Sequence, residues 1–292
     1  FIHPASPVNH EMVKKLAHNG VVALTLDGVP RISRAQNMDA LTSMSTCAGY
    51  KGMIMAANDL PYFMPQMFTA VGQIVPAKVM VIGVGVAGLQ ALATAKRLGA
   101  ITYAADIRPM AAENAKSLGA QVVDTGVDPK LAVGEGGYAM RLPDDVLAAE
   151  REKLYPTIKE MDIVFCSALI PGKVAPTIIT EEMVKGMKKG AAIVDISIDQ
   201  GGNCECTPPG KHERIHDVMI NGIKNIPGLL ANSSTWMFSQ NIYNLTKYLT
   251  HDGKIVLDPQ DEICKGITVT KDRKIVHAGC LEALGADGPL EC

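Results

Sequence analysis

A glycine-rich turn offers the clearest chemistry in this sequence. Residues 83–88 read GVGVAG, directly after the apolar run Val79–Ile82 and at the start of an apolar helical pattern. In a strand–turn–helix unit, the first glycine permits the tight turn, the second lets the backbone approach a pyrophosphate, and the third lets the helix pack on the strand. The helix N-terminus adds free N–H groups and a positive dipole end for the phosphates. We therefore expect a dinucleotide site that includes Gly83, Gly85 and Gly88.

An acidic residue completes this motif. Asp106 ends the next apolar strand, at the spacing of about 20 positions expected for the acid that binds the adenosine ribose. Its carboxylate would accept hydrogen bonds from both ribose hydroxyls and repel a 2′-phosphate, which favours NAD over NADP. Arg108 argues the other way, because an arginine could receive that phosphate. The alternative for the whole motif is a glycine turn in a structural βαβ unit.

Three further polar segments could belong to the site. The segment Arg31–Asp39 holds two arginines, an amide and a carboxylate, which could bind a polar ligand. The alternative is that this segment is a solvated start of a helix, in which Asp39 complements the helix N-terminus. The loop 134–139 is either a lid or a plain connection. The loops 168–173 and 200–203 follow strands and are expected to line the crevice at the carboxyl ends of a parallel sheet.

Two patterns suggest a metal, and we interpret neither as a metal site. Residues 212–216 read HERIH, but zinc-protease chemistry needs a helix there, and a strand-and-turn signal follows. Cys204-Glu205-Cys206 has no two further ligands at plausible spacing. The seven cysteines are scattered and odd in number, which indicates reduced thiols.

The elements that must position these residues alternate between strands and helices. Continuous apolar strands between helices indicate a parallel sheet covered on both faces, so we expect an α/β, doubly wound, Rossmann-type domain with a second, incomplete Rossmann-like α/β domain. The five strands expected in the sheet are 79–82, 101–105, 121–123, 162–167 and 191–196. The helices expected around them are 38–60, 86–98, 111–118, 144–159 and 180–187. Outside this core we expect a helix ending at Gly20, a strand at 21–26 and a helix at 236–249.

Composition excludes several classes. The chain has 292 residues, of which 47% are hydrophobic, 20% charged and 4% aromatic, with a formal net charge of -2. Such a chain is neither disordered nor attracted to nucleic acid or to an anionic membrane. The nearly uncharged run 79–95 is explained better by a buried strand, turn and helix than by a membrane span. The opening at Phe1 carries no signal-peptide pattern and reads as the tail of a strand whose beginning is missing.

Taken together, these motifs resemble the NAD(H)-binding domain I, in the α subunit, of proton-translocating NAD(P) transhydrogenase, within the alanine dehydrogenase/transhydrogenase superfamily. The matching segments are RISRAQNMDALTSMSTCAGY, VPAKVMVIGVGVAGLQA, GGYA, ALIPGK and GGNCE. The first of these segments is specific to transhydrogenase, whereas the segment VDISIDQGG at 194–202 is more similar to alanine dehydrogenases.

The resemblance assigns roles to individual residues. It implies that Arg31, Gln36 and Asp39 place the nicotinamide and its ribose, with Gln36 positioning the ring and no acid or base required. Thr42 stands where the family has serine, so a hydroxyl is kept. Val86 would lie against the pyrophosphate. The remaining expected contacts with NAD(H) come from Ile32, Ser33, Asp106, Ile107, Arg108, Leu169 and the mobile loop residues Gly137 and Tyr138.

The resemblance also implies an activity and partners. The family transfers a hydride directly from NADH on this domain to NADP+ on a separate domain III, coupled to proton movement through a membrane domain II. We expect NAD(H) here, NADP(H) only on the partner domain, a homodimer, and a soluble domain that faces the bacterial cytoplasm or the mitochondrial matrix. Residues 1–42 and 228–292 would form a discontinuous, N-terminally truncated first domain, and residues 43–227 the Rossmann domain. The alternatives are an alanine dehydrogenase-like NAD-dependent oxidoreductase and a nucleotide-binding regulatory module.

Overall fold

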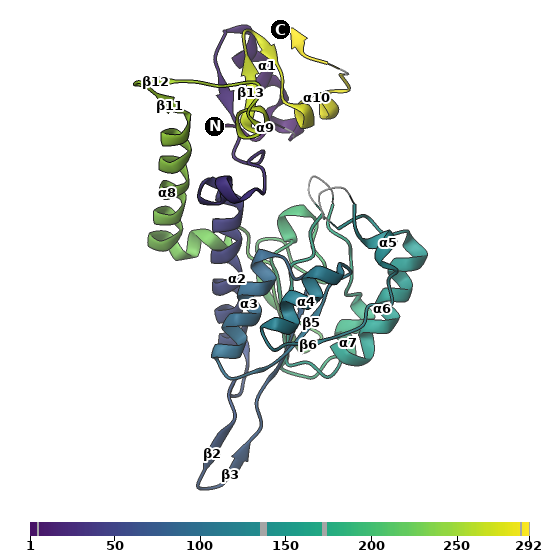
Figure 1. Ribbon diagram of the computed structural model, residues 1–292. Coiled ribbons are helices and arrows are strands. Elements are labelled where there is room, and N and C mark those ends of the chain that lie inside the picture. Colours follow the sequence, from purple (N-terminus) through teal and green to yellow (C-terminus); the bar gives the residue numbers. More distant parts are fainter. Residues whose placement is uncertain (5, 135–138, 171–173, 287, 292) are drawn as a thin grey trace. The chain divides into compact units, whose positions relative to one another are not determined.

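The structure is a computed structural model that describes residues 1–4, 6–134, 139–170, 174–286 and 288–291. The chain splits into two compact units (Figure 1). One unit combines Phe1–Met44 with Asn232–Cys292, and the other is Ser45–Ala231. We describe each unit by itself.

A seven-stranded sheet forms the centre of the unit Ser45–Ala231. Its strands are β4 (Lys78–Ile82), β5 (Ile101–Ala105), β6 (Gln121–Val122), β7 (Ile163–Cys166), β8 (Ala192–Asp195), β9 (His212–Ile215) and β10 (Val218–Asn221). The order is β6-β5-β4-β7-β8-β10-β9, and all neighbouring pairs are parallel except β10 and β9. The strand order reverses between β4 and β7, which is where doubly wound sheets bind their ligands. The predicted parallel fold is confirmed.

Helices cover both faces of this sheet. They are the C-terminal part of α2 (Ala40–Asp59), α3 (Val86–Arg97), α4 (Pro109–Ser117), α6 (Asp144–Ile158) and α7 (Glu181–Lys185). A short helix, α5 (Pro129–Ala132), precedes α6 in the chain. Short 3-10 turns lie at Ile198–Gln200 and Ile226–Leu230. Local sequence sets the helix ends: Pro109 begins α4, and the Thr180 side chain accepts the Met183 N–H at the start of α7.

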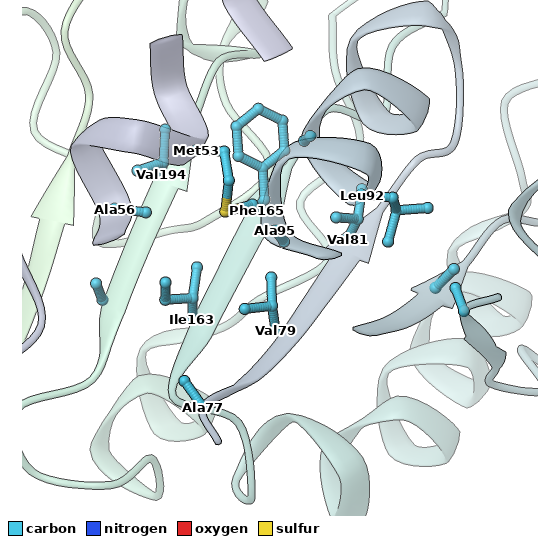
Figure 2. Packing of buried hydrophobic residues seen from close by; sticks show 14 of the residues in the cluster. Met53, Ala56, Ala77, Val79, Val81, Leu92, Ala95, Ile163, Phe165 and Val194 are labelled. Carbon is cyan, nitrogen blue, oxygen red and sulfur yellow. The ribbon is translucent and has the colours of Figure 1, made fainter. Parts of the chain in front are cut away.

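The apolar strands explain why the sheet is buried on both sides. On one face, Met53 and Ala56 of α2 and Leu92 of α3 pack on Val79 and Phe165 (Figure 2). On the other face, the cluster contains residues of α6 and α7, among them Leu154, Ile158 and Met183. The stretch 79–95 is thus a buried strand, turn and helix, as predicted. No helix of the described residues combines the length and apolarity that a membrane crossing requires.

Two hairpins differ from the sequence-based expectation. β9 and β10 extend the sheet beyond five strands, and β9 carries no clear strand signal because its edge position leaves polar side chains exposed. A second hairpin, β2 (Met67–Thr69) with β3 (Gly72–Ile74), is absent from the expected elements; it extends away from the sheet (Figure 1). Phe68 and Val71 in this hairpin are 78% and 97% exposed, so it has no buried face that would produce an alternating pattern.

The discontinuous unit is also built from helices and strands, but its described sheet is antiparallel. The order is β1 (Ala23–Leu24), β13 (Thr268–Lys271), β14 (Lys274–Ile275) and β15 (Leu290–Glu291). A tight turn at Asp272 and Arg273, both with positive φ, leaves no room for a crossover helix between β13 and β14. Ile2 belongs to no strand, although its N–H donates to the Leu24 carbonyl at 2.9 Å.

The remaining elements of this unit supply two small cores. The helices are α1 (His10–His18), α8 (Ala231–Leu249), α9 (Glu262–Ile267) and α10 (Ala278–Leu284), with 3-10 turns at Pro7–Asn9 and Ser33–Met38 and a hairpin of β11 (Thr250–His251) and β12 (Lys254–Ile255). Leu245, Leu249 and Ile263 pack with Met38 in one core. Val13 and Val269 pack with Ile275 in the other.

Candidate functional site

The glycine turn between β4 and α3 has the close backbone contacts that its sequence predicts. Gly83 has a φ of +83°, and a Cβ there would lie 2.5 Å from the Cα of Ala168. A Cβ at Gly88 would lie 2.2 Å from the Gly83 carbonyl oxygen. A Cβ at Gly85 would meet nothing within 4 Å. Packing within the protein therefore requires glycine at positions 83 and 88, whereas the side of Gly85 on which a Cβ would stand is open.

The N-terminus of α3 opens from this turn. Gly85 is its extended N-cap residue, and the Leu89 N–H donates to the Gly85 carbonyl at 2.9 Å. The first N–H groups of a helix have no acceptor within the helix, and its dipole favours an anion there. Val86, half-buried, is the first helical residue. Helix α2 packs closely behind, since a Cβ at Gly49 would lie 2.2 Å from the Ala87 carbonyl oxygen.

Asp106 joins the end of β5 to the glycine turn. Its Oδ2 accepts the Val84 N–H at 2.7 Å, and its side chain is 4% exposed. Arg108 donates to the same carboxylate from its backbone N–H at 2.8 Å, from Nε at 2.9 Å and from Nη2 at 2.8 Å. The hydrogen bond to Asp106 raises the pKa of the Arg108 guanidinium. Because each carboxylate oxygen already accepts two donors, a ribose diol would take the places that the Arg108 side chain now occupies. Ile107 lies between them, half-buried.

A second acid near Asp106 was missed in the sequence. Glu150 of α6 is 4% exposed, and burial, reinforced by the charge of Asp106, raises its pKa to about 7. The neighbouring Arg151 opposes this rise in pKa, but its guanidinium donates to the Thr177 carbonyl, at 2.9 Å from Nε and 2.6 Å from Nη2. In the sequence, Glu150 is one acid among several in a charged helix, and only the packing of α6 distinguishes it.

The loop after β7 forms the other side of the turn. The Ser167 Oγ donates to the Gly83 carbonyl at 2.6 Å. Leu169, two residues on, is 38% exposed. Across from this loop, the turn after β8 carries Gly201 and Gly202, with φ of +107° and +86°. Of the expected loop residues, 171–173 and the lid residues Gly137 and Tyr138 lie outside the described residues.

The arginine-rich segment belongs to the other unit. Ser33 begins a 3-10 turn that runs to Met38, with Gln36 and Arg31 exposed and Ile32 packed in the small core. Asp39 accepts the Thr42 N–H at 2.9 Å and the Thr42 hydroxyl at 2.6 Å, at the entry to α2. This is the helix-entry role that the sequence left open for Asp39. Contacts of these residues with a nucleotide stay a prediction.

The histidine pair of the HERIH segment does not share a helix face. His212 lies in strand β9, and its Nε2 is 3.0 Å from an Asp59 carboxylate oxygen. His216 follows in the turn with positive φ, 2.8 Å from Glu181. Within the described residues, no group of three or more histidine, cysteine, aspartate or glutamate side chains is placed to bind a metal.

Comparison with known proteins adds an independent finding. Residues 1–48 match the model "Alanine dehydrogenase/PNT, N-terminal domain" and residues 52–278 match "Alanine dehydrogenase/PNT, C-terminal domain". The first portion of the NAD(P) transhydrogenase subunit alpha of Rhodospirillum rubrum is 41% identical over 94% of this chain and 72% of that protein. The alanine dehydrogenase of Staphylococcus haemolyticus is 30% identical over 98% of this chain and 72% of that protein. The crystal structure of transhydrogenase from Sinorhizobium meliloti superimposes with a TM-score of 0.78 at 36% identity, covering 92% of this chain and 72% of that one.

Proposed function

Because this chain belongs to the alanine dehydrogenase/PNT family, we propose that it is the NAD(H)-binding component of a proton-translocating transhydrogenase. One observation carries the proposal most directly: the Asp106 carboxylate is hydrogen-bonded to the Val84 N–H of the glycine turn, at the carboxyl end of β5. A ribose bound at Asp106 and a pyrophosphate bound at the α3 N-terminus would thus belong to one dinucleotide.

The chain's own residues would bind and orient the nucleotide. The open side of Gly85 and the Val86 end of α3 would take the pyrophosphate, and Asp106 would accept the ribose hydroxyls once the Arg108 side chain swings away. The Asp106 carboxylate would disfavour a 2′-phosphate, which supports NAD(H) over NADP(H) here. When bound, NADH supplies a hydride, and its transfer to another nicotinamide needs alignment rather than an acid or base.

The partners follow from this role. We propose that the acceptor is NADP+ on a separate domain III, that transfer is coupled to proton movement through a membrane domain II, and that the chain pairs with a second copy of itself. The subunit names of the relatives support a multi-component transhydrogenase. In the cell, this region would lie outside the bilayer on the cytoplasmic or matrix side.

A mixing experiment tests the proposal. The chain is combined with purified domain III of a transhydrogenase, NADH and an NADP+ analogue whose reduced form absorbs at its own wavelength. The expected result is reduction of the analogue only when both proteins are present. The control omits domain III. Tight NADH binding without transfer in any such mixture would contradict the proposal and favour a regulatory module.

An alanine dehydrogenase-like oxidoreductase is the second candidate. The similarity to alanine dehydrogenase and the segment VDISIDQGG favour it. Pyruvate- and ammonia-dependent oxidation of NADH by the full-length protein, together with no transfer in the mixing experiment, would establish this alternative.

A further inference from the structure

A buried amide outside the dinucleotide motif fixes the backbone beside the glycine turn. Asn203 follows β8 and is 0% exposed. Its Oδ1 accepts the Ala168 N–H at 2.9 Å and the Ser197 hydroxyl at 2.8 Å. Its Nδ2 donates to the carbonyls of Ala168 at 2.8 Å and Pro176 at 2.9 Å. A side-chain amide has two donors and two acceptor positions, so every one is used.

The residue that Asn203 binds is the one that touches the glycine turn. Asn203 engages both the N–H and the carbonyl of Ala168, which fixes the orientation of that residue's backbone. A Cβ at Gly83 would lie 2.5 Å from the N and the Cα of Ala168. The adjacent Ser167 hydroxyl donates to the Gly83 carbonyl at 2.6 Å. One continuous set of contacts therefore runs from the Asn203 side chain to the first glycine of the motif.

Asn203 is itself anchored to the central sheet. Its N–H donates to Asp195 Oδ2 at 2.7 Å, at the end of β8. Asp195 is 0% exposed and also accepts the Cys204 N–H and the Thr207 hydroxyl, each at 3.0 Å. The Asn203 carbonyl accepts the Ile178 and Ile179 N–H groups at 2.8 and 2.9 Å. With its backbone fixed on both sides, the amide can transmit the position of β8 to Ala168.

We propose that Asn203 is a positioning residue that sets the spacing between the Ala168–Leu169 backbone and the Gly83 turn, and so the width of the crevice on the nicotinamide side of the dinucleotide. The inference rests on the proposed NAD(H) function. The adenosine side is built from Asp106 on β5, across β4 from β7, and shares none of the Asn203 hydrogen bonds. Loss of the amide should therefore affect the two halves of NADH unequally.

The test is Asn203→Asp, which keeps the shape of the side chain, removes both donors and turns a carboxylate toward two carbonyl oxygens. We expect the Kd of NADH to rise about tenfold, while the Kd of AMP, which holds only the adenosine half, changes less than about twofold. Both ligands are titrated calorimetrically at a temperature at which circular dichroism shows each variant folded. If Asn203 had only a structural role, its substitution would raise the Kd values of NADH and AMP by similar factors.

Asn221→Asp is the matched control. Asn221 is also 0% exposed and ends the neighbouring strand β10, but its Nδ2 has no hydrogen-bond partner among the described residues. The substitution therefore buries a similar acid without loosening Ala168, and NADH affinity should stay at the wild-type value. Ser197→Ala removes the hydroxyl that lies 2.8 Å from the Asn203 Oδ1 and 3.4 Å from the Ala168 carbonyl. We expect this variant to raise the Kd of NADH about threefold, and it tests the proposal if Asn203→Asp does not fold.

Three results separate failure of the positioning role from failure of the proposed function. Equal losses of NADH and AMP affinity in Asn203→Asp, or unchanged NADH affinity, would overturn the positioning role while leaving the proposed function intact. A wild-type chain that binds no NADH would overturn the proposed function and, with it, this inference.

Discussion

Asp162, at the amino end of the parallel sheet, and Asp106, at its carboxyl end, both have buried carboxylates, and these are satisfied in opposite ways. At the amino end, Asp162 accepts the Lys78 N–H at 2.7 Å, the Lys188 ammonium at 2.8 Å and the Tyr62 hydroxyl at 2.9 Å. At the carboxyl end, Asp106 accepts Val84 and three groups of a single residue, Arg108, two positions along the chain.

This difference separates a structural carboxylate, that of Asp162, from that of Asp106, which we propose binds the ribose. The partners of Asp162 come from three distant parts of the chain, so releasing them would disturb the fold. Burial and the hydrogen bond to Asp162 raise the pKa of the Tyr62 phenol, which therefore remains a donor. The Arg108 side chain can swing away from Asp106 without moving any helix or strand. A ligand could thus replace the Arg108 side chain at Asp106 at little structural cost.

Removing the structural carboxylate should have the largest effect. Asp162→Ala leaves a lysine, a phenol and a backbone N–H without their acceptor, so we expect a loss of about 3 kcal/mol in the free energy of unfolding, measured by urea denaturation. NADH affinity of the remaining folded protein should not change. Tyr62→Phe, which removes one of the three bonds, should cost about 1 kcal/mol. A change in NADH affinity would remove the distinction between the two ends.

Glu150, whose pKa is raised in part by the charge of Asp106, should make the stability of the protein depend on pH. The pKa of Glu150, about 7, lies above the ordinary value of 4.5, so between these values the unfolded chain loses a proton that the folded chain keeps. This contribution to stability is present in full below pH 4.5 and is lost as the pH rises to 7. Glu150→Gln should therefore be more stable than wild type by about 3 kcal/mol at pH 8 and similar at pH 4.

Urea melts at the two pH values measure this effect. Glu152→Gln, an exposed position on the same helix, is the control and should show no such pH-dependent gain. A stability difference for Glu150→Gln that is the same at both pH values would contradict the burial of an ionisable acid beside Asp106.

Changing Asp106 should have a smaller effect, confined to ligand binding. Asp106→Asn removes the charge that we propose accepts the ribose hydroxyls, and we expect NADH to bind about 1–3 kcal/mol more weakly, with thermal stability close to wild type. Asp217→Asn, in the exposed turn between β9 and β10, provides the matched control. Unchanged NADH affinity in Asp106→Asn would remove Asp106 from the site.

The sequence predicts the regions of this molecule whose physics is local. The GVGVAG turn follows from steric limits on glycine, and the apolar strands around it follow from burial on both sheet faces. Asp106 is found by its place at the end of the second of these strands. The predicted Rossmann-type sheet is confirmed. The edge strand β9 and the exposed β2–β3 hairpin carry no such signal, because neither buries a repeating face.

The features that could not be predicted from the sequence depend on contacts between residues that are far apart in the chain. Nothing in the segment around Asn203 reveals that its amide binds Ala168, 35 positions earlier in the chain. The burial of Glu150 likewise depends on the packing of α6 against the sheet. From the sequence alone, Arg108 could bind the 2′-phosphate of NADP. In the structure, its guanidinium donates hydrogen bonds to Asp106.

Calorimetric titration of the wild-type chain with NADH and with NADPH tests the central claim most directly. If the carboxyl end of the sheet is a site for NAD(H), NADH binds, and NADPH, which must place a 2′-phosphate beside Asp106, binds at least about tenfold more weakly. Equal affinity for the two nucleotides, or no binding of NADH, would contradict the account.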